Sequence, residues 1–217
     1  MNKYKEHLVS FLQELELELP ENLVERLEQF SYILREVNQK VNVVSRKMPI
    51  EWYWTNHFLD SLLILKCMTF SGLTVLDFGT GGGLPGIPLK LAVPDMKIVL
   101  LDATHKKILM VEEIIEEMKL EDCEPVCMRV EDFAAITRRP SFDVILCRAV
   151  SMEPRYVLPL RRLLKDNGQV IFYKAQMIAD IEPFQYQTLF ETEDEILGKR
   201  RLISIKRDDL IEITEVK

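Results

Sequence analysis

The sequence predicts a mixed α/β fold, in which a domain of alternating strands and helices follows an N-terminal helical segment. Three observations support this prediction. From residue 74 onward, short apolar runs alternate with amphipathic stretches, as in a parallel sheet with right-handed crossovers. Residues 4–70 instead show helical periodicity. A glycine-rich run follows the first apolar strand. We therefore expect a helical segment over residues 1–70, packed on a domain over residues 71–217.

The helical segment is expected to contain three helices. Pro20 separates a first helix, over residues 4–19, from a second that extends to residue 41, because proline has no amide proton with which to continue a helix. The second helix has apolar residues every three or four positions, which predicts one buried face. A third helix is expected over residues 50–65. Its inward side chains are expected to be Trp54, Phe58, Leu62 and Leu65.

The alternating domain is expected to contain a parallel sheet that is closed by a hairpin. Apolar β-type runs and helical periodicity locate its elements. Strands are expected near residues 74–78, 97–102, 125–130, 142–147 and 168–173, and helices near 86–93, 105–119 and 154–165. Two stretches near the end of the chain, 201–205 and 210–213, are expected to add the antiparallel hairpin.

Composition limits the classes of function. The formal net charge is −7, whereas a general nucleic-acid binder is basic, so any RNA contact must come from a local patch. The chain contains no apolar run long enough to span a membrane, and its first residues lack the apolar stretch of a signal peptide, so we expect no secretory signal. The four cysteines form no C-x-x-C pair, and Cys127 and Cys147 lie in apolar runs where we expect burial. We expect a reduced, cytoplasmic protein without structural zinc.

The glycine-rich run indicates a nucleotide pocket. Glycine permits positive φ angles and a close approach of the backbone to a ligand. A strand, a glycine turn and a helix N-terminus together form a pocket of nucleotide size. About twenty residues on, a second apolar strand ends at Asp102, where a carboxylate can accept hydroxyl groups of a ribose. The chain is therefore expected to bind a cofactor that contains adenosine.

Two readings of the glycine run point to different cofactors. From Gly81 it reads G-x-G-x-x-G, the dinucleotide pattern, but the first glycine then lies three positions beyond the strand. From Asp77 it reads D-x-G-x-G-x-G, with the acid on the strand, as in S-adenosylmethionine-dependent methyltransferases. A carboxylate attracts a sulfonium cation and repels a pyrophosphate. The second reading is favoured, and an NAD enzyme or a glycine turn without a ligand are the alternatives.

Ligands of such folds bind beyond the carboxyl ends of the strands. An acid after the third strand, Glu131, can meet the exocyclic amine of adenine. Arg148 and Lys174 follow the fourth and fifth strands, where each either pairs with a carboxylate or faces the substrate. The other residues at these strand ends are Gly79, Gly81, Gly83, Leu84, Asp102, Ala103, Thr104 and Val130.

Several motifs, taken together, resemble one family over residues 30–175. The chain is similar to the bacterial small-subunit ribosomal RNA guanine-N7 methyltransferases, also called glucose-inhibited division protein B. The glycine loop alone is not specific, but its combination with the other motifs is. The matching stretches are Asn38-Gln39-Lys40-Val41-Asn42, His57-Phe58-Leu59-Asp60-Ser61, Asp77 to Pro88, Leu101-Asp102, Arg129-Val130-Glu131 and Cys147-Arg148-Ala149-Val150.

The resemblance implies a fold, a cofactor and a set of site residues. The fold is a Rossmann-like class I S-adenosylmethionine-dependent methyltransferase with an N-terminal helical extension. Arg148 is expected near the transferred methyl group, whereas the apolar neighbours of His57 favour a structural histidine over a general base. The expected cofactor positions are Gly79, Gly81, Gly83, Leu84, Asp102, Ala103, Thr104, Val130, Glu131 and Arg148, and the expected substrate positions are Asn42, Arg46, Lys47 and Lys174.

The implied reaction transfers a methyl group from S-adenosylmethionine to N7 of a guanine in small-subunit (16S) ribosomal RNA. The implied partner is this RNA or the assembling subunit, and we expect a monomer that uses neither a metal nor a membrane. Two alternatives remain open. One is a methyltransferase of the same fold that acts on a small molecule or a protein. The other is a regulator that binds S-adenosylmethionine without catalysis.

Overall fold

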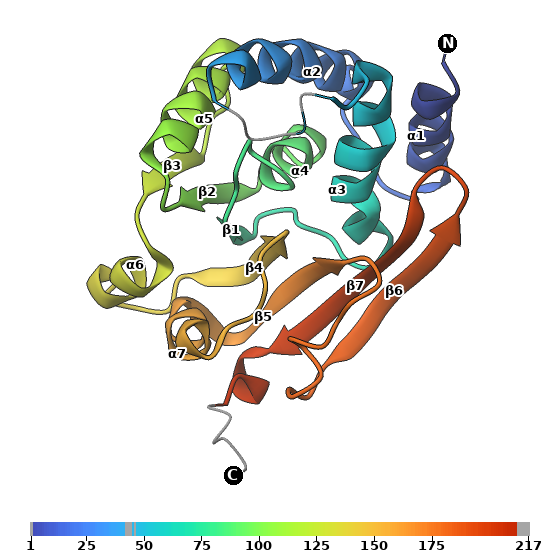
Figure 1. Ribbon diagram of the computed structural model, residues 1–217. Coiled ribbons are helices and arrows are strands. Elements are labelled where there is room, and N and C mark those ends of the chain that lie inside the picture. Colours follow the sequence, from blue (N-terminus) through green and yellow to red (C-terminus); the bar gives the residue numbers. More distant parts are fainter. Residues whose placement is uncertain (1, 42–44, 46, 212–217) are drawn as a thin grey trace.

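The computed structural model describes residues 2–41, 45 and 47–211. Within them, seven strands form one sheet in the order β3-β2-β1-β4-β5-β7-β6 (Figure 1). Strands β1 to β5 run parallel, and β7 lies antiparallel to both β5 and β6. The predicted α/β fold class is confirmed. The strands are β1 (Thr74–Phe78), β2 (Lys97–Asp102), β3 (Cys123–Cys127), β4 (Phe142–Arg148), β5 (Leu164–Lys174), β6 (Gln187–Asp194) and β7 (Gly198–Lys206).

The strand order reverses beside β1. The chain moves from β1 outward to β2 and β3, then returns to place β4 on the other side of β1. In open sheets of this kind the crossovers after β1 and β4 diverge, and a crevice opens beyond the carboxyl ends of these strands. The topology therefore places the candidate site at Phe78 and Arg148, the last residues of β1 and β4.

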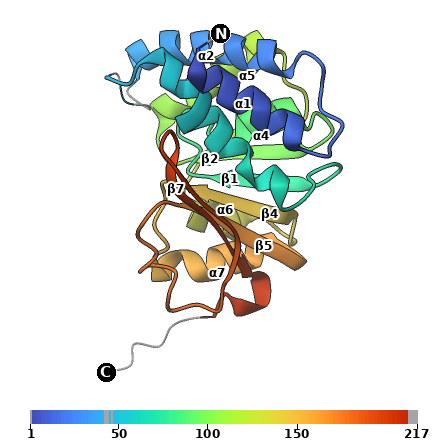
Figure 2. The same cartoon turned by 90° about the vertical axis from the view of Figure 1, so that its right-hand side faces the viewer.

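Helices cover both faces of the sheet (Figures 1 and 2). One hydrophobic core contains side chains from the N-terminal helical segment and from α4 and α5. Helices α6 and α7 contribute to a second core on the opposite face. In the part of the chain that is described, no helix is long and apolar enough to cross a membrane. The helices are α1 (Lys3–Glu14), α2 (Leu23–Lys40), α3 (Asp60–Leu62), α4 (Gly86–Ala92), α5 (His105–Met118), α6 (Val130–Ile136) and α7 (Pro154–Leu163).

The N-terminal segment shares its core with the sheet. Phe30 of α2 and Phe58 are fully buried, and their ring centroids lie 5.7 Å apart. At the C-terminal end of α5, the Arg26 guanidinium donates a hydrogen bond to the carbonyl of Met118 at 2.7 Å. The segment therefore packs directly against α4 and α5. The division of the chain at residue 70 stays a prediction.

Two predicted helices differ from the structure in extent or type. The first helix ends at Glu14 instead of continuing to residue 19, because Leu15 adopts an extended conformation. The third stretch is helical but is not one α-helix. It consists of two 3-10 turns, η1 (Ile50–Trp52) and η3 (Leu63–Lys66), which flank the π-helix η2 (Trp54–Leu59) and α3. Its four predicted inward side chains are all buried.

The predicted third strand was placed too far along the chain. The strand covers Cys123–Cys127 instead of 125–130, because helix α6 begins at Val130. Glu131 and Asp132 lie in the first turn of this helix, where carboxylates are favoured by the helix dipole. Since β3 is an edge strand, Cys127 is exposed instead of buried, whereas Cys147 is buried as expected.

The predicted hairpin had the wrong partner strand. Strand β7 pairs with Gln187–Asp194, which precedes it, and not with 210–213. Residues 210 and 211 form no strand, and 212 and 213 lie outside the described residues. Strand β6 was not predicted, because its acidic residues interrupt the apolar pattern that locates a strand in the sequence. Charged residues are typical of an exposed sheet edge. Strand β5 also starts earlier than predicted, at Leu164, with an irregular register against β4.

The shared core predicts a large loss of stability when an aromatic ring of α2 is removed. Replacement Phe30→Ala should lower the free energy of unfolding by about 3–5 kcal/mol, since the ring is fully buried. Urea denaturation measures this change. Tyr32→Ala is the matched control, because Tyr32 is on the same helix with 58% of its surface exposed, and its effect should be within about 0.5 kcal/mol. Equal losses for the two variants would contradict the shared core.

Candidate functional site

The loop after β1 is fixed to the end of β2. Gly79 and Gly81 have φ angles of +78° and +58°, which favour glycine. The backbone amides of Gly79 and Thr80 donate hydrogen bonds to the carbonyl of Leu101 at 2.8 and 3.0 Å. A Cβ atom at position 79 would lie 2.5 Å from Cγ2 of Val150. Gly79 is therefore required both by its φ angle and by the close approach of the loop after β4.

Asp77 is the fully buried acid beneath this loop. Its Oδ2 accepts hydrogen bonds from the Thr80 hydroxyl at 2.7 Å and from the Gly86 amide at 2.9 Å. Its Oδ1 has no hydrogen-bond partner in the described protein. Burial raises the pKa of Asp77 to about 6, although the bonds from Thr80 and Gly86 oppose this shift. The carboxyl group thus joins the strand, the glycine loop and the start of α4.

Asp102, the last residue of β2, has its carboxylate fixed by three donors. Oδ1 accepts a hydrogen bond from the Thr104 amide at 2.9 Å. Oδ2 accepts from the Gly81 amide at 3.2 Å and from Nζ of Lys107 at 3.1 Å. A carboxylate has about four lone-pair sites, so the group retains capacity for a ligand hydroxyl. The structure therefore holds the acid in one orientation beside the glycine loop.

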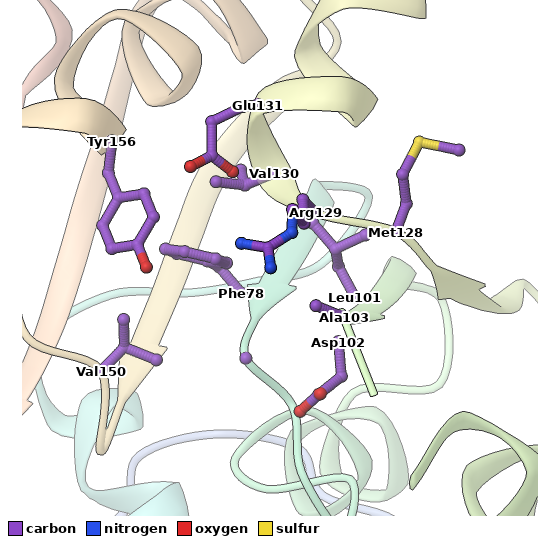
Figure 3. Close-up of a pocket in the computed structure, with 11 residues that line it drawn as sticks. Phe78, Leu101, Asp102, Ala103, Met128, Arg129, Val130, Glu131, Val150 and Tyr156 are labelled. Atoms are coloured by element: carbon purple, nitrogen blue, oxygen red, sulfur yellow. The ribbon is translucent and has the colours of Figure 1, made fainter. Parts of the chain in front are cut away.

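A pocket of about 180 Å³ lies beyond the ends of β1 and β2. Its two carboxylates, from Asp102 and Glu131, lie at opposite ends in Figure 3, and Arg129 is drawn between them. The Phe78 ring forms part of the wall and packs edge-on against Tyr156, with centroids 5.1 Å apart. The lining residues are Phe78, Gly79, Leu101, Asp102, Ala103, Met128, Arg129, Val130, Glu131, Val150 and Tyr156.

This pocket fits an adenosine group. Apolar walls suit the faces of a purine, and one acid at each end suits a ribose hydroxyl and an exocyclic amine. At Gly81 an added Cβ would find only the carbonyl of Gly79, 3.9 Å away, so the loop leaves open space above its backbone. The unpartnered Oδ1 of Asp77 lies below the same loop. The residues present therefore match the donors and acceptors that S-adenosylmethionine offers.

Half of the predicted cofactor residues line this pocket. Gly81 and Thr104 do not line it, but their amides bind Asp102. Gly83 and Leu84 are buried, and a Cβ at Gly83 would clash with Ile87. The predicted residues that line the pocket are Gly79, Asp102, Ala103, Val130 and Glu131.

Sequence reasoning missed six lining residues. Phe78 and Leu101 directly precede the predicted Gly79 and Asp102, so their positions at the strand ends were a usable signal. Tyr156 had no such signal, because it comes from the first turns of α7. The remaining three are Met128, and Arg129 and Val150, which stand in two of the stretches that resemble the family but were not among the predicted cofactor positions. The roles of all these residues in binding stay predictions.

A second pocket, of about 360 Å³, adjoins the first through Val150. It lies beyond the ends of β4 and β5. Ala149, in the loop between the pockets, has a φ angle of +58°, an uncommon conformation for a residue with a Cβ atom. The lining residues are Asp60, Arg148, Ala149, Val150, Ser151, Tyr173, Lys174, Ala175 and Arg200.

Arg148 is bound by the helical segment. Its Nε lies 3.0 Å from Oδ2 of Asp60. Nη1 donates to the Ser61 hydroxyl at 3.1 Å, and Nη2 donates to the carbonyl of Asn56. Of the two predicted possibilities, pairing with a carboxylate is therefore observed, although the side chain also lines the second pocket. Arg148 does not line the first pocket.

The remaining predicted substrate residues lie in different places. Lys174 pairs with Asp180 at 2.5 Å and lines the second pocket. Lys47 is exposed and lines neither of the two pockets. Asn42 and Arg46 lie outside the described residues. The structure thus places Lys174 in the same pocket as Arg148. The predicted roles of Asn42 and Arg46 stay predictions.

His57 is a neutral histidine above about pH 4. Burial and the neighbouring Arg148 lower the pKa of His57 to about 4. Its Nδ1 lies 3.1 Å from the carbonyl of Asn56, and its Nε2 is buried without a partner. These contacts agree with the structural histidine expected from the sequence. Within the described residues, no group of three or more His, Cys, Asp or Glu side chains is placed to hold a metal ion.

The strand order and the glycine loop define a class I methyltransferase of Rossmann-like fold. Solved structures share this architecture. A SAM-dependent methyltransferase from Aquifex aeolicus is 14% identical with a TM-score of 0.57, over 79% of this chain and 98% of that chain. M. jannaschii TYW2 in complex with AdoMet is 13% identical with a TM-score of 0.51, over 69% of this chain and 74% of that chain. At these identities the likeness concerns the fold alone.

The chain belongs to the GidB family, rRNA small subunit methyltransferase G, whose model matches residues 23–197. Proteins named "Ribosomal RNA small subunit methyltransferase G" are similar to it. The protein from Flavobacterium johnsoniae is 31% identical over 84% of this chain and 90% of its own length. The protein from Histophilus somni is 34% identical over 87% and 90%. Family membership confirms the predicted resemblance, the enzyme class and S-adenosylmethionine as cofactor.

The raised pKa of Asp77 predicts a pH-dependent contribution to stability. The folded protein holds the proton up to about pH 6, whereas the ordinary pKa is 3.8. Stability from this group is therefore full below about pH 4 and is lost as the pH rises to 6, by about 3 kcal/mol in total. Asp77→Asn removes this loss. Urea denaturation at pH 4 and pH 7 measures the free energy of unfolding of both proteins. Between these pH values the difference in stability should shift in favour of the variant by about 3 kcal/mol. The same difference at both pH values would contradict the assignment.

The contacts of Asp102 predict a specific loss of cofactor binding. Asp102→Asn removes the charge from the group that is predicted to accept the ribose hydroxyls, and should raise the Kd for S-adenosylmethionine about 10- to 100-fold. Isothermal titration calorimetry measures this Kd. Asp143→Asn is the matched control, because Asp143 also binds a backbone amide, of Thr74, and a lysine, Lys165. Asp143 lies near the start of β4, at the end of the strand opposite to the pocket, so this variant should keep the native Kd.

Proposed function

We propose that this protein transfers the methyl group of S-adenosylmethionine to N7 of a guanine in small-subunit (16S) ribosomal RNA. The observation that carries the proposal is the pair of adjoining pockets at the ends of β1 and β4. The first pocket has the acids and apolar walls of an adenosine site, and the second has cationic walls. Membership in the small-subunit methyltransferase G family supports the RNA substrate, and the sequence resemblance supports the guanine N7 atom.

The reaction requires alignment more than proton transfer. Bound S-adenosylmethionine supplies an electrophilic methyl group on a sulfonium cation. Guanine N7 has a lone pair and no proton, so the protein has no proton to remove. Holding the reacting atoms in line is worth about 7–11 kcal/mol of the barrier. Neither pocket is lined by a histidine in the described part of the chain, and the buried His57 is neutral, which agrees with this chemistry.

The residues of the first pocket are proposed to hold and orient the cofactor. Asp102 accepts the ribose hydroxyls, and Glu131 accepts the amine of adenine. The loop at Gly79 and Gly81 lies beneath the sulfur-bearing part, where the carboxyl group of Asp77 favours a cation. The role that we propose for Arg148 differs from the predicted position near the transferred methyl group. Because its guanidinium is held by Asp60 and Ser61, we propose that it shapes the wall between cofactor and substrate.

The RNA is proposed to approach over the second pocket. Lys174 lies in that pocket, and Asn42, Arg46 and Lys47 are the positions that the resemblance places on the approach. A local basic surface is needed because the chain as a whole carries a net charge of −7. We propose that the protein acts in the cytoplasm as a monomer, without a metal, on ribosomal RNA or the assembling subunit.

The direct test uses isotopically labelled S-adenosylmethionine. Small-subunit ribosomal RNA and small subunits from a strain that lacks the endogenous enzyme serve as acceptors, followed by nucleoside analysis. Label recovered as N7-methylguanosine is the expected result. Native binding of S-adenosylmethionine without transfer to either acceptor would contradict the proposal. A screen of small molecules and proteins would then identify another acceptor, or show a regulator without catalysis.

A further inference from the structure

The second pocket is a cationic site in an acidic protein. Three of its lining residues carry a positive charge, namely Arg148, Lys174 and Arg200. Asp60 is the acid among the lining residues, and Asp180 pairs with Lys174 from outside the lining. Three cations against two carboxylates leave an excess of positive charge. A partly enclosed site of this kind attracts an anion, and the anion that RNA offers is the phosphate.

Asp60 binds two of these cations with different oxygens. Oδ1 lies 2.8 Å from Nε of Arg200, and Oδ2 lies 3.0 Å from Nε of Arg148. The carboxylate is buried, with 7% of its side chain exposed. Arg148 ends β4 and Arg200 lies on β7, so these side chains come from strands separated by β5. Asp60 therefore joins three elements and fixes the spacing of two guanidinium groups.

The two arginines differ in the N–H donors that remain available to bind a ligand. The Nη1 and Nη2 atoms of Arg148 bind Ser61 and the carbonyl of Asn56. Arg200 donates from Nε to Asp60 and from Nη1 to the carbonyl of Lys199 at 2.9 Å. Its Nη2 makes no hydrogen bond within the described residues. Arg200 is thus the pocket arginine with a free, oriented donor, and hydrogen bonds from arginine to phosphate are among the stronger ones in proteins.

We propose that Arg200 binds a phosphate of the RNA substrate in the second pocket, and that Asp60 is the positioning residue that orients Arg200 for this contact. The proposal rests on the proposed function and deepens it. The phosphate belongs to the nucleotide chain beside the modified base, because the pocket adjoins the cofactor pocket at Val150. Lys174 lies in the same pocket and adds charge. Asp60 acts through Arg200 and does not touch the RNA.

The first experiment measures RNA binding without methyl transfer. The Kd for small-subunit ribosomal RNA is determined by filter binding at several salt concentrations. Arg200→Gln should raise this Kd about tenfold or more, because a hydrogen bond to a charged group is lost. The slope of log Kd against log salt should become smaller by about 0.7–0.9, as expected for one phosphate contact. The Kd for S-adenosylmethionine should stay unchanged. Arg200→Lys, which keeps the charge, should restore the salt slope.

The second experiment is a double-mutant cycle between the two residues. Asp60→Asn leaves Arg200 without its anionic partner and should also weaken RNA binding about tenfold. In the Arg200→Gln background, Asp60→Asn should have less than about a twofold further effect, because residues that act as a unit are not additive. Additive effects would show that Asp60 does not act through Arg200. If Asp60→Asn fails to fold, the salt slopes of the two Arg200 variants still decide the phosphate contact.

Glu191→Gln is the matched control. Glu191 also binds two cations, Lys199 and Arg201, which flank Arg200 in the sequence. Its side chain is 45% exposed and lines neither pocket, so native RNA binding is expected. Equal weakening in this variant, or native Kd and salt slope in Arg200→Gln, would overturn the inference. The outcome is separate from the proposed function, which is refuted when the native protein binds RNA but transfers no methyl group.

Discussion

The buried carboxyl group of Asp77 is the constraint on which the first pocket depends. It binds the Thr80 hydroxyl and the Gly86 amide, so one side chain sets both the glycine loop and the first turn of α4. The loop then places the Gly81 amide on Asp102. An acid on β1 thereby orients the acid on β2. Burial of this group opposes its ionisation, and the amides of Gly79 and Thr80 add a second attachment of the loop, to the carbonyl of Leu101 on β2.

A second constraint connects the N-terminal segment to the ends of β4 and β5. The π-helix η2 and α3 present the carbonyl of Asn56, the hydroxyl of Ser61 and the carboxylate of Asp60 to Arg148. Tyr173 of β5 also donates a hydrogen bond to the carbonyl of Ser61 at 3.0 Å. The ends of β4 and β5 are therefore bound to a helical segment that precedes the sheet in the sequence. π-helical turns often occur at functional sites, and this one directly precedes Asp60, which lines the second pocket.

The sequence was sufficient for the fold class and for five of the eleven residues that line the first pocket. Asp77, the glycines and Asp102 are local signals, because each lies at a strand end that apolar patterning locates. Tyr156 and Arg200 were not predictable in this way, since their positions depend on how α7 and β7 pack. Strand β6 was missed because its solvent-facing acids, Glu191 among them, interrupt the apolar pattern. The contacts of Arg148 join residues 87 to 92 positions apart, a separation that no local pattern reports.

The dependence of Arg148 on residues 56–61 has a consequence for the modularity of this enzyme. The Rossmann-like part cannot be treated as a minimal catalytic unit to which the N-terminal helices were appended. A chain trimmed to the sheet and its flanking helices would lose Asp60, the acid that pairs with Arg148 and Arg200. The two guanidinium groups that share this carboxylate in the second pocket would then lose their common anionic partner. Any shortened or grafted version of this scaffold must therefore retain residues 56–61, which hold Arg148 at the second pocket.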